Sequence, residues 1–236
     1  MMVSMTDDRL SMDHPLPWPG HEPALQLLPE RALFETSSQT LFVADVHLGK
    51  DAVFRARGVP VPEGSNQGSL ARLSQALTRT GAQRLVVLGD FLHAKESLAA
   101  STLTTLRAWR DRHLGVDCVV VEGNHDRHVG RVHDSFGMRT LHGVFDNSTL
   151  RGVHDPDDAP PYDGRLTLAG HVHPVVRLSN RHDSLRLPCF WLHNGVLTLP
   201  AFGEFTGGRP IDRHADPSDQ FFVISDRVSR LRQWGG

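Results

Sequence analysis

The sequence predicts an α/β sandwich of mixed β-sheets, and two patterns lead to this fold class. In the first half, short apolar runs typical of buried strands alternate with segments of helical periodicity, which favours parallel strands joined by helices. In the second half, strand-like runs follow one another without helices, which favours antiparallel pairing. The chain has 236 residues, 39% of them hydrophobic, so a substantial core can form without disulfide bonds.

The N-terminal residues 1–23 are polar and contain four prolines, so we expect a flexible leader there and a single domain over residues 24–236. Apolar runs at 25–28 and 32–34 flank a Pro-Glu turn signal and predict a hairpin. The stretch 59–68 contains prolines and glycines and is expected to be a loop.

The remaining elements follow from hydrophobic spacing. Leucines at positions 70, 73 and 77 have helical spacing and predict a helix over 69–80, which Gly81 can end. A second helix is expected over 98–114. Buried strands are expected at 41–44, 85–88, 118–121, 150–153, 166–169, 185–191 and 221–224.

Polar residues of similar chemistry follow the ends of several of these strands. Asp45 and His47 come directly after the strand at 41–44, and residues i and i+2 project to the same face of an extended chain. Because open α/β sheets bind ligands at the carboxyl ends of their strands, we expect these residues to meet in space. The full set contains Asp45, His47, Asp90, Asn124, His154, His171 and His173.

These side chains offer carboxylate, imidazole and amide donors, a mixture that suits divalent ions such as Mn²⁺, Fe²⁺ or Zn²⁺. The set is large enough for two ions, with Mn²⁺ as the expected metal. Paired ions about 3.5–4 Å apart clamp the attacking and leaving oxygens of a phosphoryl displacement. Asp90 is the lone carboxylate of its strand end and is the natural bridge between them.

Four motifs together resemble the calcineurin-like metallophosphoesterase superfamily. They are Asp-Val-His at 45–47, Gly-Asp at 89–90, Gly-Asn-His-Asp at 123–126 and Gly-His-Val-His at 170–173. Their order and spacing match the superfamily from residue 45 to residue 173. The resemblance implies a four-layer α/β/β/α sandwich, with mixed sheets flanked by helices, and a hydrolase that acts on phosphate esters.

The resemblance also implies roles for individual residues. His125 would face the scissile phosphate and protonate the leaving oxygen, with Asp126 beside it holding the ring. His133 and His142 lie in the same interval as His154 and are alternatives to it. One ion would be held by Asp45, His47, Asp90 and His173, and the other by Asp90, Asn124, His154 and His171.

A finer resemblance connects the chain with the ligase-associated DNA damage response endonucleases, a bacterial branch of this superfamily. It is based on the segments 42–50, 54–58, 88–93, 186–190 and 199–208. It implies a DNA endonuclease that works in DNA repair alongside an ATP-dependent DNA ligase, an exonuclease and a helicase. The alternatives are a phosphodiesterase or phosphatase acting on cyclic nucleotides or nucleotides, and a metal-binding scaffold without turnover.

Other residues near the motifs are candidates for substrate binding. Lys50, Arg55 and Arg57 could steer phosphate towards the metals, or they could form a solvated helix face. His93 could line the substrate groove, or its ring could bond a nearby backbone carbonyl. A candidate wall for a nucleic-acid backbone consists of Arg177, Arg181, Arg186, Arg209 and Arg213.

The composition limits the classes of function. The net charge of -2 excludes a globally basic nucleic-acid coat, although it leaves room for a local basic groove. The two cysteines, Cys118 and Cys189, are expected to be unpaired thiols in a reducing compartment, which indicates a cytoplasmic protein. No apolar run is long enough for a membrane span, and the N-terminus has no secretory signal pattern.

Overall fold

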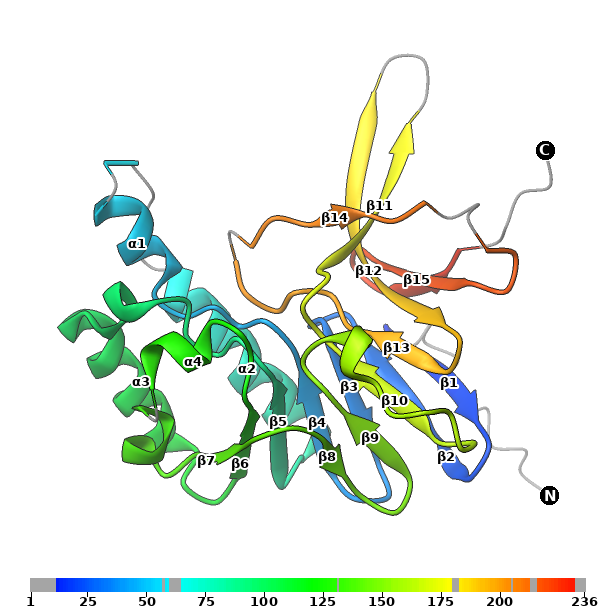
Figure 1. Cartoon of the computed structure of the whole chain (residues 1–236), viewed down its shortest axis with the longest axis horizontal. Coiled ribbons are helices and arrows are strands. Elements are labelled where there is room, and N and C mark those ends of the chain that lie inside the picture. The colour runs from blue at the N-terminus through cyan, green and yellow to red at the C-terminus, as the bar shows by residue number, and fades with distance from the viewer. Residues whose placement is uncertain are drawn as a thin grey trace, which may run out of the picture.

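The computed structural model describes residues 12–56, 58–59, 65–130, 132–179, 183–204, 206–212 and 216–231. Two β-sheets pack face to face, and the helices cover the outer face of the first sheet (Figure 1). The mixed-sheet α/β sandwich expected from the sequence is therefore confirmed. None of the described helices is long and apolar enough to cross a lipid bilayer.

The first sheet has seven strands, and their spatial order is their order in the sequence. Strands β1 to β4 pair antiparallel, whereas β4 to β7 pair parallel because helical crossovers connect them. The strands are β1 (His14–Trp18), β2 (His21–Leu28), β3 (Ala32–Glu35), β4 (Thr40–Val43), β5 (Arg84–Leu88), β6 (Asp117–Val121) and β7 (Arg139–Leu141). The α-helices are α1 (Lys50–Ala56), α2 (Ser65–Thr80), α3 (Ala100–Arg112) and α4 (Asp126–Val129). Short 3-10 helices occur at Lys95–Leu98, Val132–Phe136 and Pro156–Asp158.

The second sheet runs in the order β14-β11-β12-β13-β10-β9-β8, with β15 paired to β12 and β16 to β15. The expectation of antiparallel pairing in this half is only partly correct, because β10 is parallel to both β9 and β13. The parallel pairs place the carboxyl ends of β9 and β10 at one edge. The strands are β8 (Phe145–Asp146), β9 (Leu150–Gly152), β10 (Leu166–Ala169), β11 (Pro174–Ser179), β12 (Ser184–His193), β13 (Val196–Thr198), β14 (Arg209–Pro210), β15 (Gln220–Ile224) and β16 (Val228–Arg230).

The core has two main parts, one on each face of the first sheet. Leu41 and Val43 of β4 face the helices and share a cluster with Leu73 and Trp109. Phe42, between them, faces the second sheet and belongs to the cluster between the two sheets. Side chains of successive strand residues point to opposite faces, so an uninterrupted apolar strand can serve both layers.

The second helical layer implied by the resemblance is absent among the described residues, so the four-layer expectation is wrong in this respect. Helices α1 to α4 all lie on the side of the first sheet (Figure 1). The outer face of the second sheet carries only a small apolar cluster, centred on Val176, Cys189 and Phe221. A packed helix needs a broad apolar surface beneath it, and this face does not provide one.

The expected leader, residues 1–23, is too long. Residues 14–18 form β1, the edge strand of the first sheet, and β2 begins at His21. Leu16 is buried in the core between the sheets, whereas the neighbouring prolines of β1 are exposed. Proline is tolerated on an edge strand because its missing N–H would face no partner strand. Residues 1–11 lie outside the described residues.

Helix α2 begins at Ser65, inside the segment 59–68 that the sequence marks as loop. Gly68 lies within this helix and against the carboxylate of Glu204, where an added Cβ would stand 2.7 Å from Oε1. Glycine at this position therefore permits close packing between distant segments, which a residue pattern does not distinguish from a loop signal.

The inclusion of β1 in the core can be tested with Leu16→Ala. Truncating a buried leucine removes apolar contacts and leaves a cavity, so the free energy of unfolding should fall by about 2–5 kcal/mol. Denaturant titration followed by circular dichroism measures this change. Pro17→Ala, on the exposed side of the same strand, is the matched control and should cost less than about 1 kcal/mol. Unchanged stability of Leu16→Ala would restore the flexible-leader interpretation.

Candidate metal centre

The candidate site lies where the carboxyl ends of strands from both sheets meet. Strands β4, β5 and β6 are parallel neighbours in the first sheet, as β9 and β10 are in the second. Asp45 N donates a hydrogen bond to Gly89 O at 3.2 Å, and Gly170 N donates one to His154 O at 2.9 Å. Between the sheets, a Cβ added to Gly170 would stand 2.8 Å from Asp45 Oδ2. Residues far apart in the sequence are thus held side by side.

Five of the residues predicted as ligands have a left-handed backbone. A non-glycine residue adopts this conformation at a cost of about 1–3 kcal/mol when it is imposed by its surroundings. Conformations of this kind concentrate at functional sites, where the fold holds side chains in a fixed position. The φ angles are 54° for Asp45, 48° for His47, 50° for Asp90, 67° for His171 and 53° for His173.

A first group of donors comprises Asp45, His47 and His173. The Nε2 atoms of His47 and His173 are 3.4 Å apart, and His173 Nε2 is 3.4 Å from Asp45 Oδ1. Ligand atoms around one ion with bonds of about 2.1 Å stand about 3.0–3.5 Å apart, so these separations suit a shared ion. Burial, and then the nearby His173 and Lys50, lower the pKa of His47, which keeps its ring neutral and able to bind metal.

A second group comprises Asp90, His154 and His171, with Asn124 beside them. His154 Nε2 is 2.8 Å from Asn124 Oδ1, 3.2 Å from His171 Nδ1 and 3.6 Å from Asp90 Oδ2. The other ring nitrogen of His154 lies 3.1 Å from Leu88 O. Because a backbone carbonyl can only accept a hydrogen bond, the proton of the His154 ring lies on Nδ1. The unprotonated Nε2 then faces the second donor group.

The two alternatives to His154 make other contacts. His133 is buried, and its Nε2 lies 3.3 Å from Asp126 Oδ1. His142 is exposed, and its Nδ1 lies 3.0 Å from Glu122 Oε2. Neither belongs to a group with metal-binding geometry among the described residues. The geometry therefore favours His154 at this position.

Asp90, a member of the second group, also borders the first. Its Oδ2 is 3.8 Å from His47 Nε2 in the first group and 3.6 Å from His154 Nε2 in the second. Burial and, second, the negative charge of Asp45 raise the pKa of Asp90 to about 7. Two carboxylates buried this close together repel each other unless cations compensate their charge. The position of Asp90 suits a ligand that bridges two ions.

Further observations show that the residues fit divalent metal ions. Asp45 Oδ1 is buried and has no hydrogen-bond partner among the described residues, which is costly unless an ion contacts it. Two glycines leave space for the donors, because a Cβ at Gly89 would collide with His154 and a Cβ at Gly123 would collide with Asp90. Mixed oxygen and nitrogen donors are the set that ions such as Mn²⁺, Fe²⁺ and Zn²⁺ accept.

His125 lies beside the donor groups, but Asp126 does not hold its ring, so that interpretation of the sequence is wrong. His125 Nδ1 instead lies 2.6 Å from the backbone oxygen of His93, and His125 Nε2 is 3.9 Å from Asp90 Oδ2. Consecutive residues at a helix start project about 100° apart, so they do not face each other. The buried Asp126 carboxylate accepts hydrogen bonds of 3.0–3.2 Å from the backbone N–H groups of Phe91, Leu92 and Gly123.

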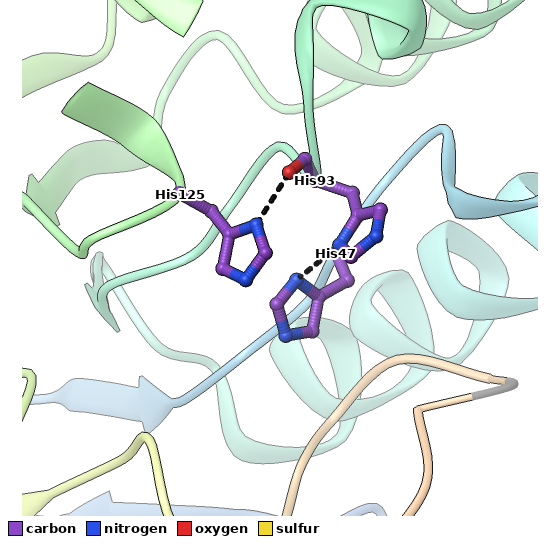
Figure 2. A group of neighbouring side chains, drawn as sticks. All are labelled: His47, His93 and His125. Atoms are coloured by element: carbon purple, nitrogen blue, oxygen red, sulfur yellow. Dashed lines mark hydrogen bonds between the residues drawn. The ribbon is translucent and has the colours of Figure 1, made fainter. Parts of the chain in front are cut away.

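Figure 2 shows His47, His93 and His125 as a compact cluster of rings. His93 Nδ1 is 3.2 Å from His47 Nδ1. The His93 ring also stacks on that of His125, with centroids 4.7 Å apart and 22° between the planes. His93 therefore contacts both a candidate ligand and the candidate acid, a position that suits the groove-lining role expected from the sequence.

Of the three basic residues that follow β4, Lys50, Arg55 and Arg57, the two that the structure describes differ from each other in their contacts with the site. Arg55 on α1 pairs with Asp51 one turn earlier, Nη1 to Oδ2, at 3.1 Å, so the helix-face alternative accounts for it. Arg57 lies outside the described residues. Burial lowers the pKa of Lys50, and the negative charges of Asp45 and then Asp90 oppose this effect. The ammonium group of Lys50 is therefore close enough to the donor groups to interact with them electrostatically.

Three of the five candidate wall arginines lie on adjacent strands of the second sheet. Arg177 on β11 is directly opposite Arg186 on β12, and β14, which contains Arg209, pairs with β11. Strands β11 and β12 extend beyond the sandwich as a hairpin (Figure 1). Like charges directly opposite each other are unfavourable without a counter-ion, so this hairpin suits an anionic partner. Arg181 and Arg213 lie outside the described residues.

Two features near the site carry little signal in the sequence. Asp155 places Oδ2 3.5 Å from His171 Nε2, and only its position next to His154 points to it. Two hollows adjoin His171, one of about 430 Å³ beside Asn124 and one of about 810 Å³ beside Trp191. Hollows arise where distant segments pack, which residue patterns do not reveal. They provide room for a substrate next to the donor groups.

The chain is similar to several proteins of known structure. The crystal structure of the nuclease MPE from Pseudomonas putida superimposes with a TM-score of 0.79 at 35% sequence identity, covering 93% of this chain and 100% of that chain. A protein of unknown function from Aquifex aeolicus matches at 19% identity and a TM-score of 0.39, over 61% of this chain and 81% of its own. A phosphoesterase from E. coli matches at 15% identity and a TM-score of 0.39, over 79% and 87% of the two chains.

A family model for calcineurin-like phosphoesterases matches residues 38–218, which contain every residue of the two donor groups. No curated protein matches the chain. The matched segment covers most of the described structure, and its metal-binding chemistry agrees with the geometry above. The chain belongs to the calcineurin-like phosphoesterase family and is a metal-dependent phosphoesterase.

Proposed function

We propose that this protein is a two-metal phosphodiesterase that cleaves DNA strands internally, as an endonuclease. The observation that carries the proposal is the pair of donor groups on either side of Asp90, with His125 Nε2 3.9 Å from that carboxylate. Such an arrangement can present two ions and a non-ligand acid to one phosphate. The likeness to the nuclease MPE over 93% of the chain supports nucleic acid as the substrate.

The proposed ligands divide as the donor groups do. Two bound divalent ions supply Lewis-acid chemistry, which activates a water molecule and offsets charge on the phosphoryl oxygens. We propose Mn²⁺ as the native metal, with Fe²⁺ and Zn²⁺ as the alternatives that the donor mixture accepts. One ion would be held by Asp45, His47, Asp90 and His173, and the other by Asp90, Asn124, His154 and His171.

His125 is the proposed general acid. The His93 backbone oxygen lies 2.6 Å from His125 Nδ1 and accepts a hydrogen bond from it, so Nε2 is the nitrogen that can deliver a proton to the leaving oxygen. The stacked His93 ring restricts rotation of the His125 ring. Asp126 is a positioning residue, because its carboxylate holds the backbone of the loop after β5 and of the loop after β6 together.

We extend the proposal to the cellular setting. The resemblance of the segments 42–50 and 199–208 supports a role in bacterial DNA repair, in association with an ATP-dependent DNA ligase, an exonuclease and a helicase. A cytoplasmic location agrees with Cys118 and Cys189, which are buried free thiols. The paired arginines of the β11–β12 hairpin would contact the phosphate backbone of DNA.

Circular single-stranded DNA tests the proposed activity, because a circle has no ends and only an endonuclease can open it. With Mn²⁺ the protein should linearise the circle, and with a chelator it should not. Cyclic nucleotides and mononucleotides are assayed in parallel. If these small esters are hydrolysed while the circle stays intact, the protein is a small-molecule phosphodiesterase and the endonuclease proposal is wrong.

Asp90→Asn tests the shared carboxylate. Loss of one negative charge between the donor groups should deplete bound metal and reduce hydrolysis of bis-p-nitrophenyl phosphate by more than about 100-fold. Elemental analysis of the purified protein measures metal content beside the rate. Asp111→Asn, on the exposed surface of α3, is the control and should keep both. A variant at Asp90 with wild-type rate and wild-type metal content would contradict the assignment.

His125→Ala and Asp126→Ala should impair different properties, turnover in the first and stability in the second. His125→Ala should retain metal and lower turnover by about 10²–10⁴-fold, most strongly for poor leaving groups that need protonation. Asp126→Ala should lower the free energy of unfolding by roughly 3 kcal/mol or more, because three backbone N–H groups lose a charged acceptor. Thermal melting and a leaving-group series separate the two. Metal loss in His125→Ala would instead make that ring a ligand.

The metal-free protein should become less stable as the pH rises. Folding raises the pKa of Asp90 from near 4 to about 7, so the folded state holds a proton that the unfolded state has lost. From about pH 5 to about pH 8 the free energy of unfolding should therefore decrease, by roughly 1–3 kcal/mol. Excess Mn²⁺ should reverse the trend, and Asp90→Asn should flatten it. Denaturant titrations with chelator check this, and stability rising over the same window would contradict it.

A further inference from the structure

The hollow of about 810 Å³ beside Trp191 has no assigned part in the metal binding or proton transfer proposed above. It lies on the outer face of the second sheet over β12 and β13, where no described α-helix packs and the short 3-10 helix Pro156–Asp158 forms part of the lining. We call it the β12–β13 hollow. His171 and Asp155 line it, and they also line the smaller hollow next to Asn124. The β12–β13 hollow therefore borders the second donor group directly.

Much of the lining of the β12–β13 hollow is apolar. Val196 on β13 and Ile211 after β14 face it, and the ring of Trp191 on β12 lies beside them. Trp191 and Ile211 also pack against the apolar cluster on this face of the sheet, so they are held in place. Further apolar lining comes from Pro156, Val172 and Pro210. A volume and lining of this kind are typical of pockets for small-molecule ligands.

A hydrogen-bonded chain fixes the aromatic wall of the hollow. The Asp219 carboxylate, whose side chain is 2% exposed, accepts hydrogen bonds from Trp191 Nε1 at 2.9 Å and His193 Nδ1 at 2.6 Å. The centroids of the Trp191 and His193 rings are 5.4 Å apart, and the interplanar angle is 32°. Two rings held by one buried carboxylate form a rigid surface, and a planar heterocycle can bind there with little loss of conformational entropy.

The charges around the hollow select against a phosphate group and in favour of a hydrogen-bond donor. Arg209 is the one arginine or lysine among the described lining residues. Carboxylates predominate at the rim, and they belong to Asp155, Asp157, Asp212 and Asp216. Carboxylates repel phosphate but accept hydrogen bonds from amino groups, such as the exocyclic amino groups of nucleobases.

We propose that the β12–β13 hollow binds the nucleobase of the nucleotide next to the scissile phosphate, and that it favours bases with an exocyclic amino group. The inference rests on the proposed function and names the substrate feature that the site recognises. The base stacks against the Trp191 and His193 wall, and its amino group donates to the carboxylate rim. A base bound there has left any duplex stack, so the target nucleotide is unpaired in the bound state.

Matched diesters test the proposal. One is a deoxyadenosine p-nitrophenyl phosphate, and the other has the same sugar, phosphate and leaving group but no base. Both the 3′ and 5′ isomers are used, and each kcat/KM is measured with Mn²⁺. The wild-type protein should favour the base-containing ester by about tenfold in at least one isomer, which is the size of one stacked base. A ratio below about twofold in both isomers would overturn the proposal.

Variants identify the hollow as the origin of this ratio. Val196→Trp fills the hollow and should bring the ratio near unity, whereas Leu185→Trp, on the exposed end of β12, should keep the wild-type ratio. His193→Ala, which removes half of the aromatic wall, gives a second reading if Val196→Trp does not fold. Wild-type ratios in both hollow variants would reject the proposal. Absence of hydrolysis even of bis-p-nitrophenyl phosphate would instead reject the phosphodiesterase on which it rests.

Discussion

The structure depends above all on the burial of two aspartates at the junction of its two sheets. Asp45 and Asp90 are almost fully buried, and the charge of Asp45 contributes to the raised pKa of Asp90. Their backbones are left-handed, and glycines at 89, 123 and 170 make room for their carboxylates or for the imidazole next to them. A fold gains no stability from burying like charges in strained loops. Bound cations would explain this arrangement, because both carboxylates would be attracted to the cations and their mutual repulsion would be offset.

The sandwich architecture serves the site by bringing strand ends from two sheets to one place. The first sheet supplies Asp45, Asp90 and Asn124 after its parallel strands, and the second supplies His154 and His171 after β9 and β10. Neither sheet holds a complete donor group alone, so sheet packing and site formation are coupled. The outer face of the second sheet also contributes to the site. It leaves the hollow beside His171 accessible, whereas an α-helix packed over β12 and β13 would cover it.

Features with a local cause could be predicted from the sequence. Apolar runs at β4, β5 and β6 identify buried strands, and the polar residues that follow them lie together because parallel strands end at a common edge. Features set by distant contacts could not. The sequence places Asp126 next to His125, but the first turn of α4 directs Asp126 into the protein, where it binds backbone N–H groups. Likewise, the prolines of β1 indicate a flexible leader when the sequence is considered alone. In the structure, pairing with β2 makes this segment an edge strand.

The Asp90 carboxylate is proposed to join two metal ions, and anomalous diffraction from crystals grown with Mn²⁺ tests this bridge most directly. Two anomalous peaks are expected, both in contact with Asp90. One peak should also contact His47 and His173, and the other Asn124 and His154. A single peak, or two peaks of which Asp90 touches only one, would show that Asp90 does not bridge two ions.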